Sequence, residues 1–117
     1  MYGGDNIGIQ KDAGELLIYA YKKYLKESIF IKPLEILEST KWEAPRINNA
    51  LDYLIDINAI KYYKEGGNTK GVKNFSISGL TDIGIGIIED KRKFKTHFGF
   101  DIGIPGVFTF SWGKSES

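Results

Sequence analysis

Arginine and asparagine side chains gather just after Pro45, and both types carry hydrogen-bonding groups that match the edges of nucleotide bases. The candidate base readers are Arg46, Asn48 and Asn49. A guanidinium can bind guanine with two hydrogen bonds, and a carboxamide can bind adenine in the same way. Asp52 would share their helical face, where its carboxylate either accepts a hydrogen bond from the cytosine amino group or is simply solvated.

A second set of candidate residues lies on a glycine-rich stretch further along the chain. Its cationic and small polar side chains are Lys64, Asn68, Thr69, Lys70 and Lys73. Lysine neutralises phosphate, and hydroxyl and amide groups bond to phosphate oxygens, so these residues are expected to hold a nucleic-acid backbone. Residues 91–95 form another basic run, which either does the same or is a solvated face.

A helix and a hairpin are needed to position these side chains, and the spacing of apolar residues predicts both. Ile47, Leu51 and Leu54 recur at i, i+4 and i+7, which predicts a helix over 44–57 with one buried face. Asn58 suits the left-handed position at which a helix ends. Two β-branched and aromatic runs then flank a glycine-rich tip, which predicts a two-stranded hairpin over 61–77.

The segments before that helix predict further elements. Asp12 and Glu15 have the spacing of a capping box and predict a helix over 13–26. Residues 28–31 are β-branched and aromatic and predict a short edge strand. Pro33 suits the first position of a second helix, which ends before the turn at Trp42.

The segments after the hairpin predict a fourth helix and a second hairpin. Thr81 is the expected N-cap of the helix, and Gly84 and Gly86 would allow it to pack closely on a neighbour. Apolar residues alternate beyond this helix, and a three-residue loop would place six of them on one face: Phe98, Phe100, Ile102, Phe108, Phe110 and Trp112. The cover of this face is either the same domain or a second copy of the chain.

The order of these elements and two short motifs resemble the winged helix-turn-helix transcriptional regulators of bacteria and archaea. Ile47–Leu54 and Asn58-Ala-Ile stand where that family has its recognition helix and a Leu-x-x-x-Gly-Leu-Ile motif, with Asn58 in place of the usual glycine. Leu80-Thr-Asp-Ile-Gly is similar to the start of the helix after the wing. The resemblance covers about 13–90. It implies an α+β winged helix with a three-helix core, a two-stranded wing and a fourth helix.

The expected organisation has three parts. Residues 1–11 form an N-terminal arm, 12–90 the winged helix, and 91–117 a basic linker with a C-terminal β-hairpin extension. The only histidine, His97, and the pair Asp52 and Asp56 are too sparse to indicate an enzyme or a metal site. No cofactor is expected.

Composition excludes several classes of protein. Cysteine is absent, so disulfides, thiolate metal sites and a cysteine nucleophile are excluded. No apolar run is long enough for a transmembrane helix and no signal peptide is recognisable, so a cytoplasmic location is expected. The net charge of +1 is low for a nucleic-acid binder, but residues 1–60 carry −2 and residues 61–117 carry +3.

Two functions follow from these patterns. The first is a small sequence-specific protein that binds double-stranded DNA as a homodimer and regulates transcription, so that two recognition helices meet successive major grooves. The second is a winged helix that serves only protein–protein assembly. The near-neutral charge and Asp52 favour assembly, and the lysines of the hairpin favour DNA.

Overall fold

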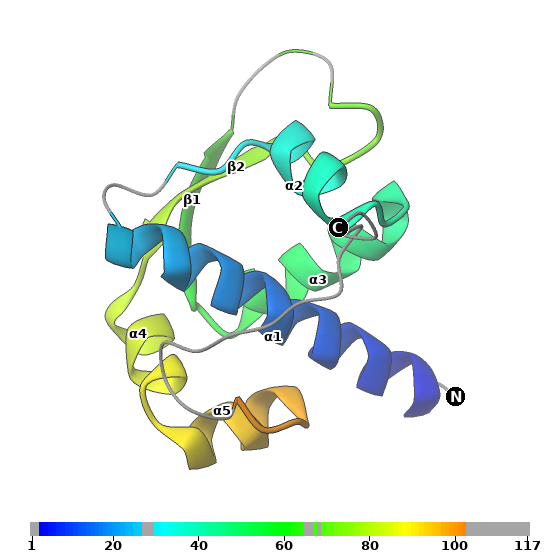
Figure 1. Cartoon of the computed structure of the whole chain (residues 1–117). Coiled ribbons are helices and arrows are strands. Elements are labelled where there is room, and N and C mark those ends of the chain that lie inside the picture. Colours follow the sequence, from blue (N-terminus) through cyan, green and yellow to red (C-terminus); the bar gives the residue numbers. More distant parts are fainter. Residues whose placement is uncertain (1–2, 27–29, 65–66, 68, 103–117) are drawn as a thin grey trace, which may run out of the picture.

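The protein has an α+β fold in which helices surround a small two-stranded antiparallel sheet (Figure 1). The computed structural model describes residues 3–26, 30–64, 67 and 69–102, with only the backbone of residues 3–7. The elements in chain order are α1 (Gly3–Lys26), α2 (Pro33–Thr40), α3 (Ala44–Asp56), β1 (Ile60–Lys64), β2 (Phe75–Leu80), α4 (Asp82–Ile88) and α5 (Lys91–Phe98). None of the helices in these ranges combines the length and the apolarity that crossing a membrane requires.

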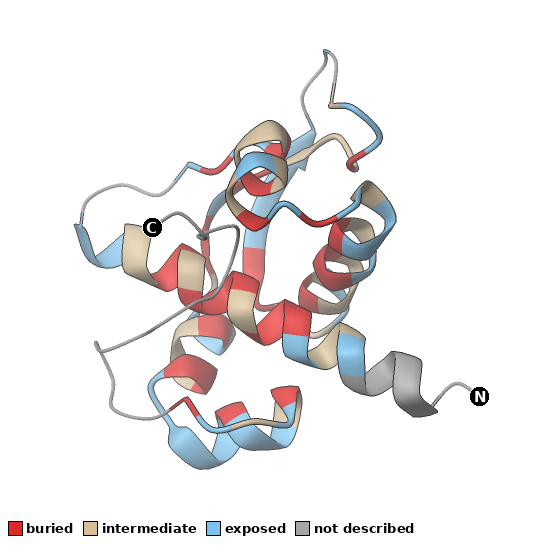
Figure 2. Ribbon diagram, turned by 45° about the vertical axis from the view of Figure 1, so that its right-hand side comes forward, coloured by how far each residue is buried: buried red, intermediate tan, exposed pale blue. Residues whose placement is uncertain are grey.

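The core lies along α1, which crosses the middle of the molecule (Figure 2). Leu16 and Leu17 of α1 are buried against the apolar stripe of α3, of which Ile47 and Leu51 are also buried. Phe94 of α5 is buried in the same core. The i, i+4, i+7 pattern of α3 therefore faces the core as predicted.

Three predicted helix starts are confirmed by local geometry. Pro33 occupies the start of α2, and Pro45 lies in the first turn of α3. The Oγ1 atom of Thr81 accepts a hydrogen bond from the Gly84 N–H at 2.9 Å and so caps α4. Asn58 has a φ of 59° and adopts the expected left-handed conformation after α3.

The sheet pairs β1 with β2, and the segment before α2 adds one bridge. Tyr62 lies opposite Ile77, and a register shift between Lys61 and Tyr62 bends the hairpin. Ile31 and Ile77 exchange two backbone hydrogen bonds of 2.9 Å. The expected edge strand is thus a single bridge within the described residues, and it lies on the side of β2 away from β1.

The N-terminal arm and the capping box were wrong predictions. Residues 3–11 form the first turns of α1, and Asp12 lies inside the helix, where its carboxylate binds Arg46. Glycines at positions 3, 4, 8 and 14 lower the local helix propensity, so the sequence gave no clear signal of a helix there. The spacing of Asp12 and Glu15 imitated a helix start.

The basic linker and the first strand of the C-terminal hairpin were also wrong. Residues 91–98 form α5, which Asp90 caps by accepting hydrogen bonds from the backbone N–H groups of Arg92 and Lys93. Phe94 and Phe98 are one helical turn apart and both are buried, which makes helix the better arrangement for this stretch. Gly99 then ends α5 with a φ of 81°. The expected second strand, 108–112, lies outside the described residues.

Candidate nucleic-acid interface

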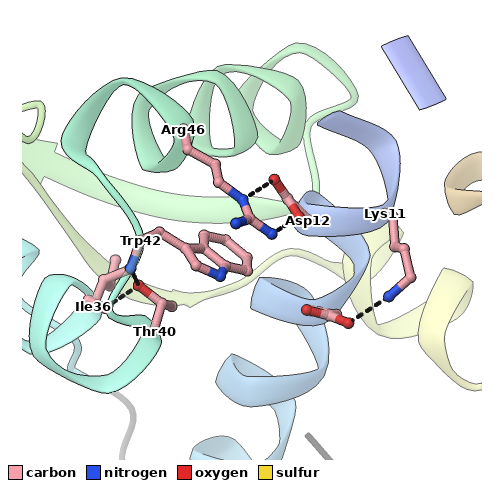
Figure 3. Close-up of polar contacts among 7 residues, drawn as sticks. Lys11, Asp12, Ile36, Thr40, Trp42 and Arg46 are labelled. Carbon is pink, nitrogen blue, oxygen red and sulfur yellow. Dashed lines mark hydrogen bonds and ion pairs between the residues drawn. The ribbon is translucent and has the colours of Figure 1, made fainter. Parts of the chain in front are cut away.

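Arg46 is half exposed, and two neighbours hold its guanidinium in place (Figure 3). Its Nε and Nη2 atoms donate hydrogen bonds of 2.8 and 3.0 Å to the two carboxylate oxygens of Asp12. Its guanidinium also lies 4.2 Å from the ring centroid of the buried Trp42. The hydrogen bonds to Asp12 raise the pKa of Arg46 above its usual value. The predicted guanine reader therefore joins α3 to α1 in this structure.

The turn between α2 and α3 brings Trp42 under this guanidinium. The Oγ1 atom of Thr40 donates to the carbonyl oxygen of Ile36 at 2.8 Å and accepts a hydrogen bond from the Trp42 N–H at 3.0 Å (Figure 3). Lys41 completes the turn in the left-handed conformation. Trp42 is buried and anchors this turn to the core.

Asn48 holds the wing loop, a name used here for residues 69–74. Its Nδ2 atom donates to the carbonyl oxygen of Gly71 at 3.0 Å, and its Oδ1 atom accepts from the Lys73 N–H at 2.7 Å. Both ends of the carboxamide are thus used within the chain, which leaves it poorly placed to read adenine. Asn48 is a positioning residue for the wing loop, and its sequence neighbours gave no indication of this role.

Asn49 is the third predicted base reader on α3. Its side chain is exposed, as are Pro45 and Asp56 on the same face. Asp52 carries the negative charge that opposed the DNA interpretation, and it forms an ion pair of 3.4 Å with Lys73. This pair partly neutralises Asp52 and ties α3 to the wing loop a second time.

The other residues that were predicted to contact the nucleic-acid backbone have different environments. Lys64 ends β1 and is exposed, and Lys70 is exposed on the wing loop with a φ of 54°. The hydroxyl of Thr69 donates to the carbonyl oxygen of Val72 at 2.6 Å and so closes the turn of the loop. Val72 is buried and anchors the loop to the core. Asn68 lies outside the described residues.

Two further exposed lysines border this region, of which the sequence interpretation did not assign Lys32. Lys61 is exposed on β1, and Lys32 is exposed beside the Ile31 bridge. Lys32 could have been found by following the predicted edge strand to its end, since that strand was expected to join the sheet. With Lys64 and Lys70, these residues give the strands and the wing loop a positive character.

The two basic regions lie at opposite ends of the molecule. The wing loop extends beyond α2 at one end, and α5 forms the other end (Figures 1 and 2). On α5, Lys91, Arg92 and Lys95 line a shallow hollow together with Asp101, which lies 3.8 Å from Lys95. Residues 91–95 and the wing loop therefore do not form one continuous basic surface.

His97 lines a shallow groove between α4 and α5, together with Asp82 and Lys93. Among the residues that the structure describes, no three histidine, aspartate or glutamate side chains gather as a metal site requires. Comparisons of the chain with protein-family models, curated proteins and solved structures find no match.

Proposed function

We propose that the protein binds double-stranded DNA as a winged helix, with α3 facing the major groove and the hairpin with its wing loop on the adjacent backbone. The observation that carries the proposal is the pair of contacts from Asn48 to Gly71 and Lys73. They fix the wing loop against the first turns of α3, so that the lysines of the hairpin and Asn49 belong to one rigid surface. A surface fixed in advance loses less conformational entropy when it binds.

The order of the elements supports the same proposal. A long helix, a bridging segment, a helix, a turn and a helix precede a two-stranded hairpin. This is the layout in which a winged helix presents one helix and one hairpin to a duplex. The wing would supply phosphate contacts from Lys64 and Lys70, which are both exposed.

The contacts that the predicted base readers make within the protein favour binding to the DNA backbone over reading of the bases. Arg46 and Asn48 are engaged within the protein, and Asn49 is the remaining candidate reader on α3. Phosphate contacts give affinity for any sequence, and base contacts give preference for one. In this proposal the protein therefore binds most duplexes with similar affinity. We also propose that the protein regulates transcription. As a homodimer it would span two major grooves.

A second candidate function is protein–protein assembly without DNA. The hydrogen bonds that Arg46 and Asn48 make within the chain favour it, because a face built to read bases would keep these polar groups available. Asp52 on the same face favours it further.

Salt-dependent binding separates the two functions. The test compares the wild-type chain with Lys64→Ala/Lys70→Ala on a short mixed-sequence duplex at several salt concentrations. Lys73 is left unchanged because it pairs with Asp52. If both lysines neutralise phosphates, the slope of log affinity against log salt falls by about one to two units. The affinity of the variant should fall by a similar factor for every duplex sequence.

The matched control is Lys91→Ala/Lys93→Ala, which removes the same charge from α5 at the other end of the molecule. This control should leave the slope unchanged. Absence of duplex binding at low salt would overturn the DNA proposal and leave assembly. A slope that falls in the α5 variant alone would move the interface to the opposite end.

A further inference from the structure

Two consecutive tyrosines on β1 are exposed. Tyr62 keeps 41% of its surface accessible and Tyr63 keeps 42%. They are consecutive, so their side chains leave opposite faces of the strand. Lys61 and Lys64 flank them and are also exposed. The wing hairpin therefore presents one aromatic ring on each face, with a cation on either side of the pair.

Each tyrosine ring is supported by a second ring. Tyr62 lies 4.9 Å from Phe75 of β2 between ring centroids, and Tyr63 lies 5.8 Å from Phe30. Such contacts restrict the orientation of the exposed ring before any ligand arrives. The Nζ atom of Lys32 lies 5.7 Å from the Phe30 ring centroid, which brings another cation to the Tyr63 side. These are rigid, flat apolar surfaces within a positively charged border.

We propose that Tyr62 and Tyr63 stack unpaired nucleotide bases, while Lys61 and Lys64 hold the phosphates beside them. The preferred ligand is then DNA that contains a single-stranded segment. Base–aromatic stacking within a cationic groove is the general means by which proteins bind single strands without regard to sequence. This inference rests on the proposed function in that the partner is nucleic acid, but it depends on β1 and not on α3.

Charge complementarity decides in favour of nucleic acid over an apolar protein partner. A protein surface that covered Tyr62 and Tyr63 would also have to bury or pair the lysines on both sides of them, which is costly without matching carboxylates. A single strand supplies both a flat apolar base and a phosphate at each nucleotide. On each face of β1 one ring likewise has one lysine beside it, because Tyr62 shares a face with Lys64 and Tyr63 shares a face with Lys61.

The test measures binding of the full chain to three fluorescently labelled probes by anisotropy. They are a blunt duplex, the same duplex with a single-stranded overhang, and the duplex with an overhang of abasic units, which keeps the phosphates without the bases. Stacking of one base or more should make the base-containing overhang bind about fivefold or more tighter than the abasic one. Tyr62→Leu/Tyr63→Leu should abolish this gain.

Two controls separate stacking from folding and from hydroxyl chemistry. Tyr24→Leu removes a tyrosine on α1 that is also 42% exposed and also stacks on a second ring, that of Tyr21. This variant should still bind the base-containing overhang more tightly than the abasic one. Tyr62→Phe/Tyr63→Phe retains the rings and should do so too. Circular dichroism melting of every variant checks that the fold is intact.

The outcomes distinguish this inference from the proposed function. Equal affinity for base-containing and abasic overhangs, with duplex binding intact, overturns stacking alone. A gain that survives in the double leucine variant also overturns it. Tyrosine-dependent binding of the overhang without binding of the blunt duplex supports stacking and overturns the duplex proposal. Binding of no probe overturns both.

Discussion

Arg46 illustrates how a side chain can occupy the expected face of a helix and still have a different role. The helical periodicity correctly predicted that Arg46 lies beside the solvent-facing row of α3. Its partner Asp12 is 34 residues away in the sequence, so no local pattern could reveal the contact. A guanidinium that forks onto a carboxylate cannot fork onto guanine at the same time.

Arg46→Ala is therefore expected to act on stability. Removing the guanidinium leaves the nearly buried carboxylate of Asp12 without this partner and uncovers Trp42. The free energy of unfolding should fall by about 1–2 kcal/mol, toward the low end for charged hydrogen bonds because Arg46 is half exposed. Urea denaturation measures the loss. Arg92→Ala on the exposed side of α5 should stay within about 0.5 kcal/mol of wild type. Unchanged stability with a loss of duplex preference would restore Arg46 as a base reader.

Tyr21 gives the protein a pH dependence at alkaline pH. Its hydroxyl donates a hydrogen bond of 2.7 Å to Glu89, and this bond, helped by burial, raises the pKa of Tyr21 from 10.0 to about 12. Only the neutral phenol can donate. Because the folded-state pKa is the higher one, the stabilisation is complete below about pH 10 and is lost as the pH rises toward 12.

The measurement compares wild type with Tyr21→Phe by urea denaturation over this pH range. Wild type should be the more stable protein at neutral pH, and its advantage should shrink between about pH 10 and pH 12. Lysine deprotonation affects both proteins and cancels in the difference. A constant difference over the whole range would show that the Glu89 bond does not control the ionisation.

At the scale of elements, the sequence predicted what has a local signal and missed what does not. Proline at the start of α2 and α3, the Thr81 cap and the β-rich runs of the hairpin each depend on neighbouring residues, and these predictions hold. The start of α1 and the whole of α5 were missed. In α5, the alternation of Phe98, Phe100 and Ile102 imitated a strand, whereas burial of Phe94 and Phe98 one turn apart favours a helix.

The two glycines of α4 offer a matched test of element packing. A methyl group on Gly84 would collide with the carbonyl oxygen of Ala59, which is backbone and cannot move aside, whereas Gly86 has open space. Gly84→Ala should lower the free energy of unfolding by about 1–3 kcal/mol through overpacking. Gly86→Ala should raise it by up to about 1 kcal/mol, because alanine favours the helix. Thermal denaturation of both variants shows whether each substitution lowers or raises the stability. A gain in stability from Gly84→Ala would contradict the close contact of α4 with Ala59.

At the scale of the whole molecule, α1 connects two ends with different chemistry. The wing loop with its lysines forms one end, next to the exposed tyrosines of β1, and α5 forms the other end (Figure 1). Gly14 of α1 lies against Phe98 and Phe100, and a Cβ atom there would approach Phe98 to within 2.8 Å. The sequence left open whether the aromatic face is covered by its own domain or by a second copy of the chain, and as far as residue 102 these residues pack on their own domain. The homodimer remains a prediction for light scattering on the full chain.

The concentration dependence of stability decides whether Phe98 packs within one chain. Phe98 is 1% exposed beside Phe94 and Tyr53, so Phe98→Ala should lower the free energy of unfolding by about 3–5 kcal/mol. If the packing is intramolecular, the same loss is measured at every protein concentration. If Phe98 were buried by a partner copy, dilution would destabilise wild type and the difference from the variant would shrink. Thr96→Ala, exposed on the same helix, should stay within about 0.5 kcal/mol of wild type at all concentrations.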